Sequence, residues 1–277
     1  MSAGCIPPVT RYALRIMDSF LTSKPLIGMI HLQPLAGSVG YGRNGIKPII
    51  DAALRDLYAL ESGGVDAVFI ENLGDAPYAK TAPVETVAMM TAVAHVLIER
   101  AHIPVGINVL RNDGMAALSI AAATGASFIR VNVFCGVAFT DQGMVEGQAR
   151  KLLALQRDLG TETLILADVH VKHAAHLTSL EEAALDADRN NPYGLIVSGI
   201  GTGRRTSPED LQTVRQISPL PVFIGSGVRI DNVSTYREAD GFIVGTVLKE
   251  EGCVEAPVDV ERVKAMADAI ASLRDPA

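Results

Sequence analysis

The stretches Pro221-Val222-Phe223-Ile224-Gly225-Ser226-Gly227-Val228 and Ala239-Asp240-Gly241-Phe242-Ile243-Val244-Gly245-Thr246 decide the fold of this chain. Each contains a short apolar run that ends in glycine and a small hydroxyl residue. Such runs are typical of buried parallel strands, and glycine lets backbone N–H groups approach an anion closely. Two of these turns near the end of the chain indicate the phosphate cradle that follows the last two strands of a (β/α)₈ barrel.

The rest of the chain repeats the same strand-then-helix pattern. Eight apolar runs are separated by amphipathic segments, at a spacing that suits βα units. This count favours a single (β/α)₈ barrel over residues 1–277 rather than a doubly wound sheet. The predicted strands are Leu26–Ile30, Ala67–Ile70, Pro104–Asn108, Phe128–Asn132, Leu164–Asp168, Gly194–Val197, Val222–Ile224 and Phe242–Val244, and the predicted helices include Ile46–Ser62, Val84–Arg100, Met115–Ala123 and Met144–Leu159.

Local residues mark several helix ends. Gly63-Gly64 and Gly160 stand where helices are expected to stop. Ser207, followed by Pro208, predicts an N-cap with proline in the first turn and a capping box. Residues 11–22 predict an extra N-terminal helix that closes the bottom of the barrel.

Composition limits the classes of partner. The chain has 277 residues and is 48% hydrophobic, which suits one large core, and its net charge of -7 argues against nucleic-acid binding. Three separated cysteines give no disulfide framework or zinc motif. With neither a secretion signal nor an apolar run of about 18 residues, we expect a cytoplasmic protein without an integral membrane segment. The apolar content is compatible with a homo-oligomer.

Polar residues gather where the predicted strands end, and in barrels the chemistry lies at this end. A functional role is favoured for Asp168 and His170, because alternation along the strand puts both on one inward face, with Lys172 if the strand continues. We predict a catalytic set of His31, Glu71, Arg130, Asp168, His170 and Lys172. We predict substrate contacts from Asn72, Asn108, Asn132 and Ser198.

Several of these residues also have a purely structural interpretation. Arg130 could pair with Asp168 or Glu71, since buried charges need partners. Asn108 and Asn132 could simply satisfy loop backbone groups. A metal site built from His31, Glu71, Asp168 and His170 has no ligand-spacing motif behind it, so we predict neither metal nor cofactor.

Three glycine-rich turns at consecutive strand ends make the phosphate prediction stronger than any one of them alone. A single Gly-Ser-Gly is usually just a tight turn. The predicted phosphate-binding residues are Gly201, Gly203, Ser226, Gly227, Gly245 and Thr246. The N–H groups of Gly227, Gly245 and Thr246, with a short helix start after the last strand, would hold a dianion.

The loops 198–203, 225–228 and 244–246 resemble the three phosphate loops of the tryptophan synthase α subunit and related ribulose-phosphate-type barrels. In that comparison Glu71 matches the position of the family's catalytic carboxylate. The resemblance implies a phosphate site and names no substrate.

A second resemblance spans nearly the whole chain. The segments 28–38 (GMIHLQPLAGS), 71–78 (ENLGDAPY), 106–113 (GINVLRND), 130–132 (RVN) and 168–173 (DVHVKH) are similar to the hallmark segments of the BtpA/SgcQ family. The resemblance implies a TIM barrel. It also implies membership of a family named for a factor needed for photosystem I accumulation and for a protein of a sugar-related operon, and it implies no reaction.

Two functions compete at this point. The first is an enzyme on a small phosphorylated metabolite, a sugar phosphate or nucleotide-like compound, in which Glu71, Asp168 and His170 supply acid and base and Lys172 or Arg130 stabilises negative charge. Lyase, isomerase or glycosidic-cleavage chemistry would fit, and Lys172 could instead form a Schiff base. The second is a non-catalytic assembly or stability factor for a membrane complex. A closed, charged barrel mouth favours the enzyme, whereas a large exposed apolar patch favours the factor.

Overall fold

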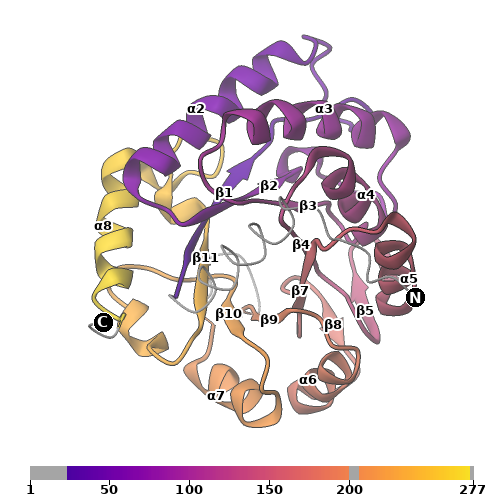
Figure 1. Ribbon diagram of the computed structural model, residues 1–277, viewed down its shortest axis with the longest axis vertical. Coiled ribbons are helices and arrows are strands. Elements are labelled where there is room, and N and C mark those ends of the chain that lie inside the picture. Colours follow the sequence, from indigo (N-terminus) through magenta and orange to yellow (C-terminus); the bar gives the residue numbers. More distant parts are fainter. Residues whose placement is uncertain (1–23, 200–205, 275–277) are drawn as a thin grey trace, which may run out of the picture.

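The computed structural model describes residues 24–199 and 206–274. In these residues eight parallel strands close into a barrel in the order β1-β11-β10-β9-β7-β4-β3-β2, and the predicted (β/α)₈ barrel is confirmed (Figure 1). The predicted helix at 11–22 lies outside the described residues. The barrel strands are β1 (Leu26–His31), β2 (Ala67–Glu71), β3 (Val105–Asn108), β4 (Phe128–Val131), β7 (Leu164–Asp168), β9 (Gly194–Val197), β10 (Val222–Ile224) and β11 (Gly241–Val244).

Helices form an outer ring around these strands (Figure 1). They are α2 (Lys47–Gly63), α3 (Val84–Arg100), α4 (Gly114–Thr124), α5 (Ala149–Leu159), α6 (Leu180–Arg189), α7 (Pro208–Ile217) and α8 (Val260–Ala271). Short 3₁₀ turns are η1 (Leu73–Asp75), η2 (Val233–Tyr236), η3 (Thr246–Leu248) and η4 (Glu250–Gly252), so η2 replaces the helix between β10 and β11. None of the helices in the described ranges has the length and apolarity needed to cross a bilayer.

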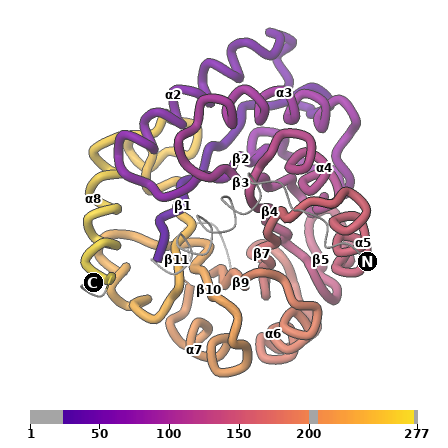
Figure 2. Tube along the Cα trace, viewed as in Figure 1, coloured from indigo at the N-terminus to yellow at the C-terminus, as the bar shows by residue number. Residues whose placement is uncertain are grey.

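The chain closes the ring by bringing its two ends together. Figure 2 shows β1, from the start of the described chain, beside β11 near its end, and Leu26 of β1 is in register with Phe242. Lys24 Nζ donates to the carbonyl oxygens of Arg237 and Ala239 at 2.8 and 2.9 Å. The closed ring leaves no free edge strand, which removes a surface prone to intermolecular pairing.

An apolar layer fills the lower part of the barrel. Phe69 and Phe128 meet edge to face with ring centroids 4.7 Å apart. A Cβ on Gly106 would lie 2.2 Å from the Phe128 ring, so only glycine at position 106 leaves room for that ring. The layer consists of Ile27, Met29, Ala67, Phe69, Phe128, Leu166, Ile196, Phe223 and Ile243. Since alternate residues of a strand point to the same face, the next inward position of each strand lies directly above this layer.

The predicted helix start at Met144 is wrong. Gly143–Glu146 is strand β6, which pairs antiparallel with β5 (Val137–Thr140), and α5 begins only at Ala149. The two-residue strand β8 (Ala175–His176) completes a small sheet in the order β6-β5-β8. This sheet has an apolar cluster of its own, formed by Val133, Ala138, Val145 and Val171.

The helix ends largely follow the predicted signals. Gly64 and Gly160 end α2 and α5 with φ of 89° and 61°, as predicted. The Ser207 hydroxyl caps α7 by accepting from the N–H groups of Glu209 and Asp210, so the predicted N-cap is confirmed. The reciprocal capping box forms instead at Ser179, with Glu182, at the start of α6.

Candidate functional site

A cavity of about 1630 Å³ lies at the carboxyl ends of the barrel strands. It exceeds the usual ligand-pocket range of roughly 300–1,000 Å³, because a side lobe beside α2 extends the barrel mouth. Its polar lining residues in the mouth include His31, Glu71, Arg111, Arg130, Asn132, Lys172, Ser226 and Thr246, and those in the lobe include Asp56 and Lys249.

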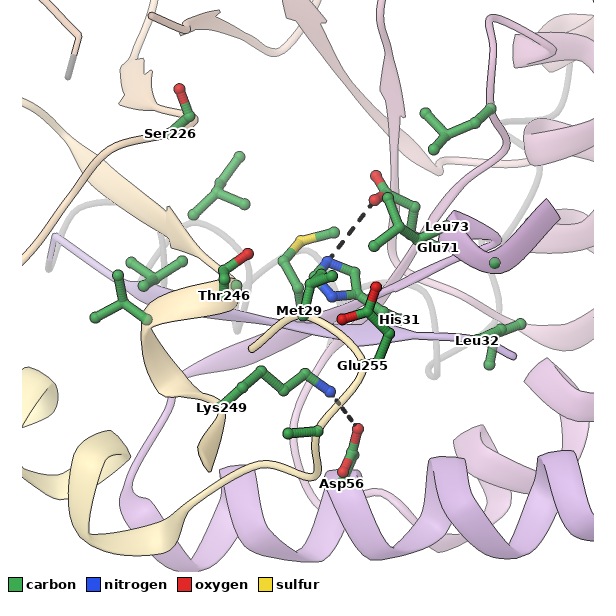
Figure 3. Close-up of a pocket in the computed structure, with 18 of the residues that line it drawn as sticks. Met29, His31, Leu32, Asp56, Glu71, Leu73, Ser226, Thr246, Lys249 and Glu255 are labelled. Atoms are coloured by element: carbon green, nitrogen blue, oxygen red, sulfur yellow. Dashed lines mark hydrogen bonds and ion pairs between the residues drawn. The ribbon is translucent and has the colours of Figure 1, made fainter. Parts of the chain in front are cut away.

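Glu71 ends β2 and faces the cavity. Its Oε2 accepts a hydrogen bond of 2.5 Å from Asn108 Nδ2, and its Oε1 lies 3.8 Å from His31 Nε2 (Figure 3). Burial, with smaller effects from Lys249 and Lys172, lowers the pKa of His31 to about 3. The imidazole is therefore neutral near pH 7, and its contact with Glu71 is neither an ion pair nor a hydrogen bond.

Arg130 is fixed by a buried carboxylate beneath it. Its Nε and Nη2 donate to the two oxygens of Asp168, both at 2.8 Å. The same carboxylate accepts from Ser198 Oγ at 2.9 Å and from Asn132 Nδ2 at 3.1 Å. The structural pairing considered for Arg130 is thus present with Asp168, which is saturated and does not line the cavity.

Two further cations approach the cavity from neighbouring loops. Arg111 follows β3, is only 7% exposed, and donates from Nη2 to the Lys172 carbonyl oxygen at 2.6 Å. Lys172 follows β7. Burial, and then the positive charge of Arg130, lower the pKa of its ammonium group. Both effects disfavour the charged amine.

Glycine turns after β10 and β11 form another wall of the cavity. Gly227 has φ of 74°, and a Cβ on Gly245 would lie 3.0 Å from His31 Cε1. In the described part of the chain, the N–H groups of Gly227, Val228 and Thr246 bond to no acceptor. The predicted short helix after the last strand is the 3₁₀ turn η3.

A buried ion pair forms the floor of the side lobe. Lys249 Nζ, on a residue 2% exposed, lies 2.6 Å from Asp56 Oδ2 on α2. Asp56 Oδ1 also accepts from the Val258 N–H at 3.0 Å. Figure 3 shows His31 between this pair and Glu71, so the imidazole separates the side lobe from the barrel mouth.

The structure separates some predicted site residues from the cavity. The expected alternation through His170 does not hold, because β7 ends at Asp168. The His170 ring instead stacks on His176, with centroids 4.1 Å apart, outside the cavity lining. Asn72 accepts from the Leu110 N–H at 2.7 Å and so orders a loop. Like these two, Asn108 and Ser198 lie outside the lining, and Gly201 and Gly203 lie outside the described residues.

Other lining residues were not among the predicted site residues. Arg111 could have been added from its place just beyond a strand end. Asp56 and Lys249 are 193 residues apart and carry no local signal that brings them together. In residues 24–199 and 206–274, no three His, Cys, Asp or Glu side chains are grouped so that they could hold a metal ion.

Known proteins resemble this chain in sequence and in fold. A Synechocystis protein named Photosystem I biogenesis protein BtpA is 42% identical over 262 residues, which cover 92% of this chain and 91% of that protein. An uncharacterised protein of Pyrococcus furiosus is 48% identical over 249 residues, covering 89% and 95%. Tryptophan synthase from M. tuberculosis matches in structure with a TM-score of 0.58 at 18% identity, covering 96% of this chain and 99% of that chain.

The structural match is too distant in sequence to show more than the barrel fold. The sequence profile of the BtpA family, in contrast, matches residues 22–272. Together with the 42% identity to the Synechocystis protein, this match shows that the chain belongs to the BtpA family.

Proposed function

We propose that this protein is an enzyme that binds a small phosphorylated metabolite and transfers a proton on it, in an isomerase or lyase reaction. The observation that carries the proposal is the carboxylate of Glu71, which faces the cavity beside a neutral His31. A carboxylate and an uncharged imidazole at one reacting centre are suited to proton abstraction next to a carbonyl group.

The phosphate is assigned to the glycine turns. The unbonded N–H groups of Gly227, Val228 and Thr246 supply donors that an anion would accept from. Ser226 and Thr246 line the same wall with hydroxyl groups. Holding the phosphate there orients the rest of the ligand toward the barrel axis.

Glu71 is assigned as the base. Asn108 fixes one of its oxygens and leaves the other, Oε1, on the side of His31. The neutral His31 donates a hydrogen bond to the ligand oxygen where negative charge develops, and Arg130 stabilises that charge. Asp168 is a positioning residue in this scheme, because its contacts are to Arg130 and other protein groups.

Deuterium incorporation tests the reaction class. The protein is incubated in D₂O with sugar phosphates and nucleoside monophosphates that raise its melting temperature. An isomerase or lyase introduces deuterium at carbon, which NMR detects, whereas glycosidic cleavage releases a base without exchange. Glu71→Gln should abolish exchange while phosphate binding persists, and the control Glu99→Gln, an exposed glutamate of α3, should not. Unchanged exchange in Glu71→Gln would overturn its role, and no stabilisation by any phosphorylated compound would overturn the phosphate site.

A second candidate is a non-catalytic assembly factor for a membrane complex. Two observations favour it: the name of the Synechocystis relative, and the exposed side chains of Phe139, Met144 and Leu177 at the small sheet. Phe139 and Met144 are cross-strand partners and so share one face. If Phe139→Ser with Met144→Ser abolishes a cellular phenotype that Glu71→Gln leaves intact, the factor is favoured over the enzyme.

A further inference from the structure

The barrel mouth holds a cluster of two basic side chains in addition to Arg130: Arg111, which is buried, and Lys172, which is partly exposed. Arg130 is paired with Asp168, but no carboxylate of the described residues lies within ion-pair distance of Arg111 or Lys172. The one hydrogen bond that the Arg111 side chain makes within residues 24–199 and 206–274 goes to a carbonyl oxygen, that of Lys172. In the same ranges Lys172 Nζ makes none. A buried guanidinium normally has an anionic partner, so the surroundings of Arg111 indicate an absent anion.

The nearby negative charge favours a monoanion over a second phosphate. Glu71 ends β2, which pairs with β3, the strand before Arg111, so a dianion beside Arg111 would be repelled more strongly than a carboxylate. Arg111 also offers a planar set of N–H donors, which suits a carboxylate.

Arg111 lies across the barrel from the glycine turn that follows β10, whereas Arg130 lies next to that turn, with its Nη2 3.3 Å from where a Cβ on Gly225 would stand. In the strand order, β3 lies four places from β10 in either direction, so Arg111 and the turn at Gly227 follow opposite strands. A ligand held at both places would span the mouth. Glu71 ends β2, the neighbour of β3, and so lies beside the path between them.

We propose that Arg111 and Lys172 bind a carboxylate of the ligand, so that the substrate is a phosphorylated carboxylic acid with its two anionic groups at opposite sides of the mouth. This inference rests on the proposed phosphate site and adds the second anchor. It gives Arg111 a binding role that no sequence motif assigned to it.

Matched pairs of probes test the second anchor. Isothermal titration calorimetry on the full chain compares 6-phosphogluconate with sorbitol 6-phosphate, and 3-phosphoglycerate with glycerol 3-phosphate. Each pair differs in a carboxylate against a CH₂OH group, and inorganic phosphate reports the phosphate site alone. The expected result is about tenfold tighter binding of the carboxylate member in at least one pair, as for one charge-assisted hydrogen bond.

Variants assign the preference to the cluster. Arg111→Met should reduce it to less than about threefold, with inorganic phosphate binding unchanged. Lys172→Met serves as a second variant because its Nζ supports no contact in the described ranges, so it keeps the test valid if Arg111→Met does not fold. Arg262→Met is the control, since Arg262 lines the same cavity near Asp259 but is exposed.

The outcomes separate the two proposals. Equal binding within both pairs, with inorganic phosphate still bound, would overturn the carboxylate site and leave the phosphate site standing. A preference that survives in both cluster variants would overturn its assignment to Arg111 and Lys172. Failure of inorganic phosphate and of every probe to bind would overturn the proposed function and the inference with it.

Discussion

Replacing Asp168 by alanine should destabilise the barrel strongly. The Asp168 side chain is fully buried and accepts from Arg130 Nε and Nη2, Ser198 Oγ and Asn132 Nδ2. Alanine removes all these acceptor sites at once. Arg130, whose side chain is 5% exposed, would then remain as a buried cation without its partner.

The size of the loss follows from that pairing. Breaking a buried ion pair by removing one partner costs about 3–5 kcal/mol, whereas replacing both partners by apolar residues is often near neutral. Asp168→Ala should therefore lower the free energy of unfolding by about 3–5 kcal/mol. Arg130→Met combined with Asp168→Leu should cost less than Asp168→Ala alone, because no uncompensated charge remains.

Urea unfolding followed by circular dichroism at pH 7 measures both effects. The mutants are compared at constant m-value, so that a change in midpoint reports stability. A loss below about 1 kcal/mol in Asp168→Ala would refute the reasoning, as it would mean that Arg130 regains solvent or another partner. So would a double mutant whose loss exceeds that of Asp168→Ala.

Three other predictions concern the rest of the cavity. Burial lowers the pKa of His31 to about 3 in the folded state, whereas in the unfolded chain it is about 6.5. As the pH falls below about 6.5, His31 therefore takes up a proton in the unfolded state but not in the folded state, and the free energy of unfolding decreases. The loss attributable to His31 is about 2 kcal/mol from pH 7 to pH 5, and His31→Gln should flatten the measured profile by that amount. Lys249→Met should lower the free energy of unfolding in urea by about 3–5 kcal/mol, because buried Asp56 would lose its cationic partner. Adding Asp56→Asn should recover part of this loss, and no recovery would contradict the pairing. Gly245→Ala places a Cβ 3.0 Å from His31 and 3.2 Å from Met29, so it should lower the free energy of unfolding by about 1–3 kcal/mol. It should also weaken inorganic phosphate binding in calorimetry, and an unchanged affinity would remove Gly245 from the phosphate site.

The sequence predicts the barrel well because its strands are buried on both faces. Such strands form continuous apolar runs, and Leu164–Asp168 and Gly194–Val197 match their predicted bounds. The hairpin of β5 and β6 was missed because Met144 and Val145 also fit the apolar face of the following helix. The turn Asp141-Gln142-Gly143, with Gly143 at φ of 85°, was the signal that marks it.

The sequence predicts only part of the candidate site. The rule that barrel chemistry lies at strand ends found Glu71, His31 and Arg130, which line the cavity. It misplaced His170, because the alternation assumed a strand that has already ended. The contact between Lys249 and Asp56 depends on closure of the barrel, which brings the loop after β11 against α2. No local sequence pattern contains that information.

The small sheet gives this barrel a rim that can change independently. Its own apolar cluster, separate from the barrel layers, joins β5 and β6 to the loops after β4 and β7, and Asp141 at the hairpin tip lines the cavity. Lengthening or recharging the tip would therefore alter ligand selection without repacking the strands beneath. A change confined to this rim would leave in place the strands that carry Glu71, His31 and Arg130.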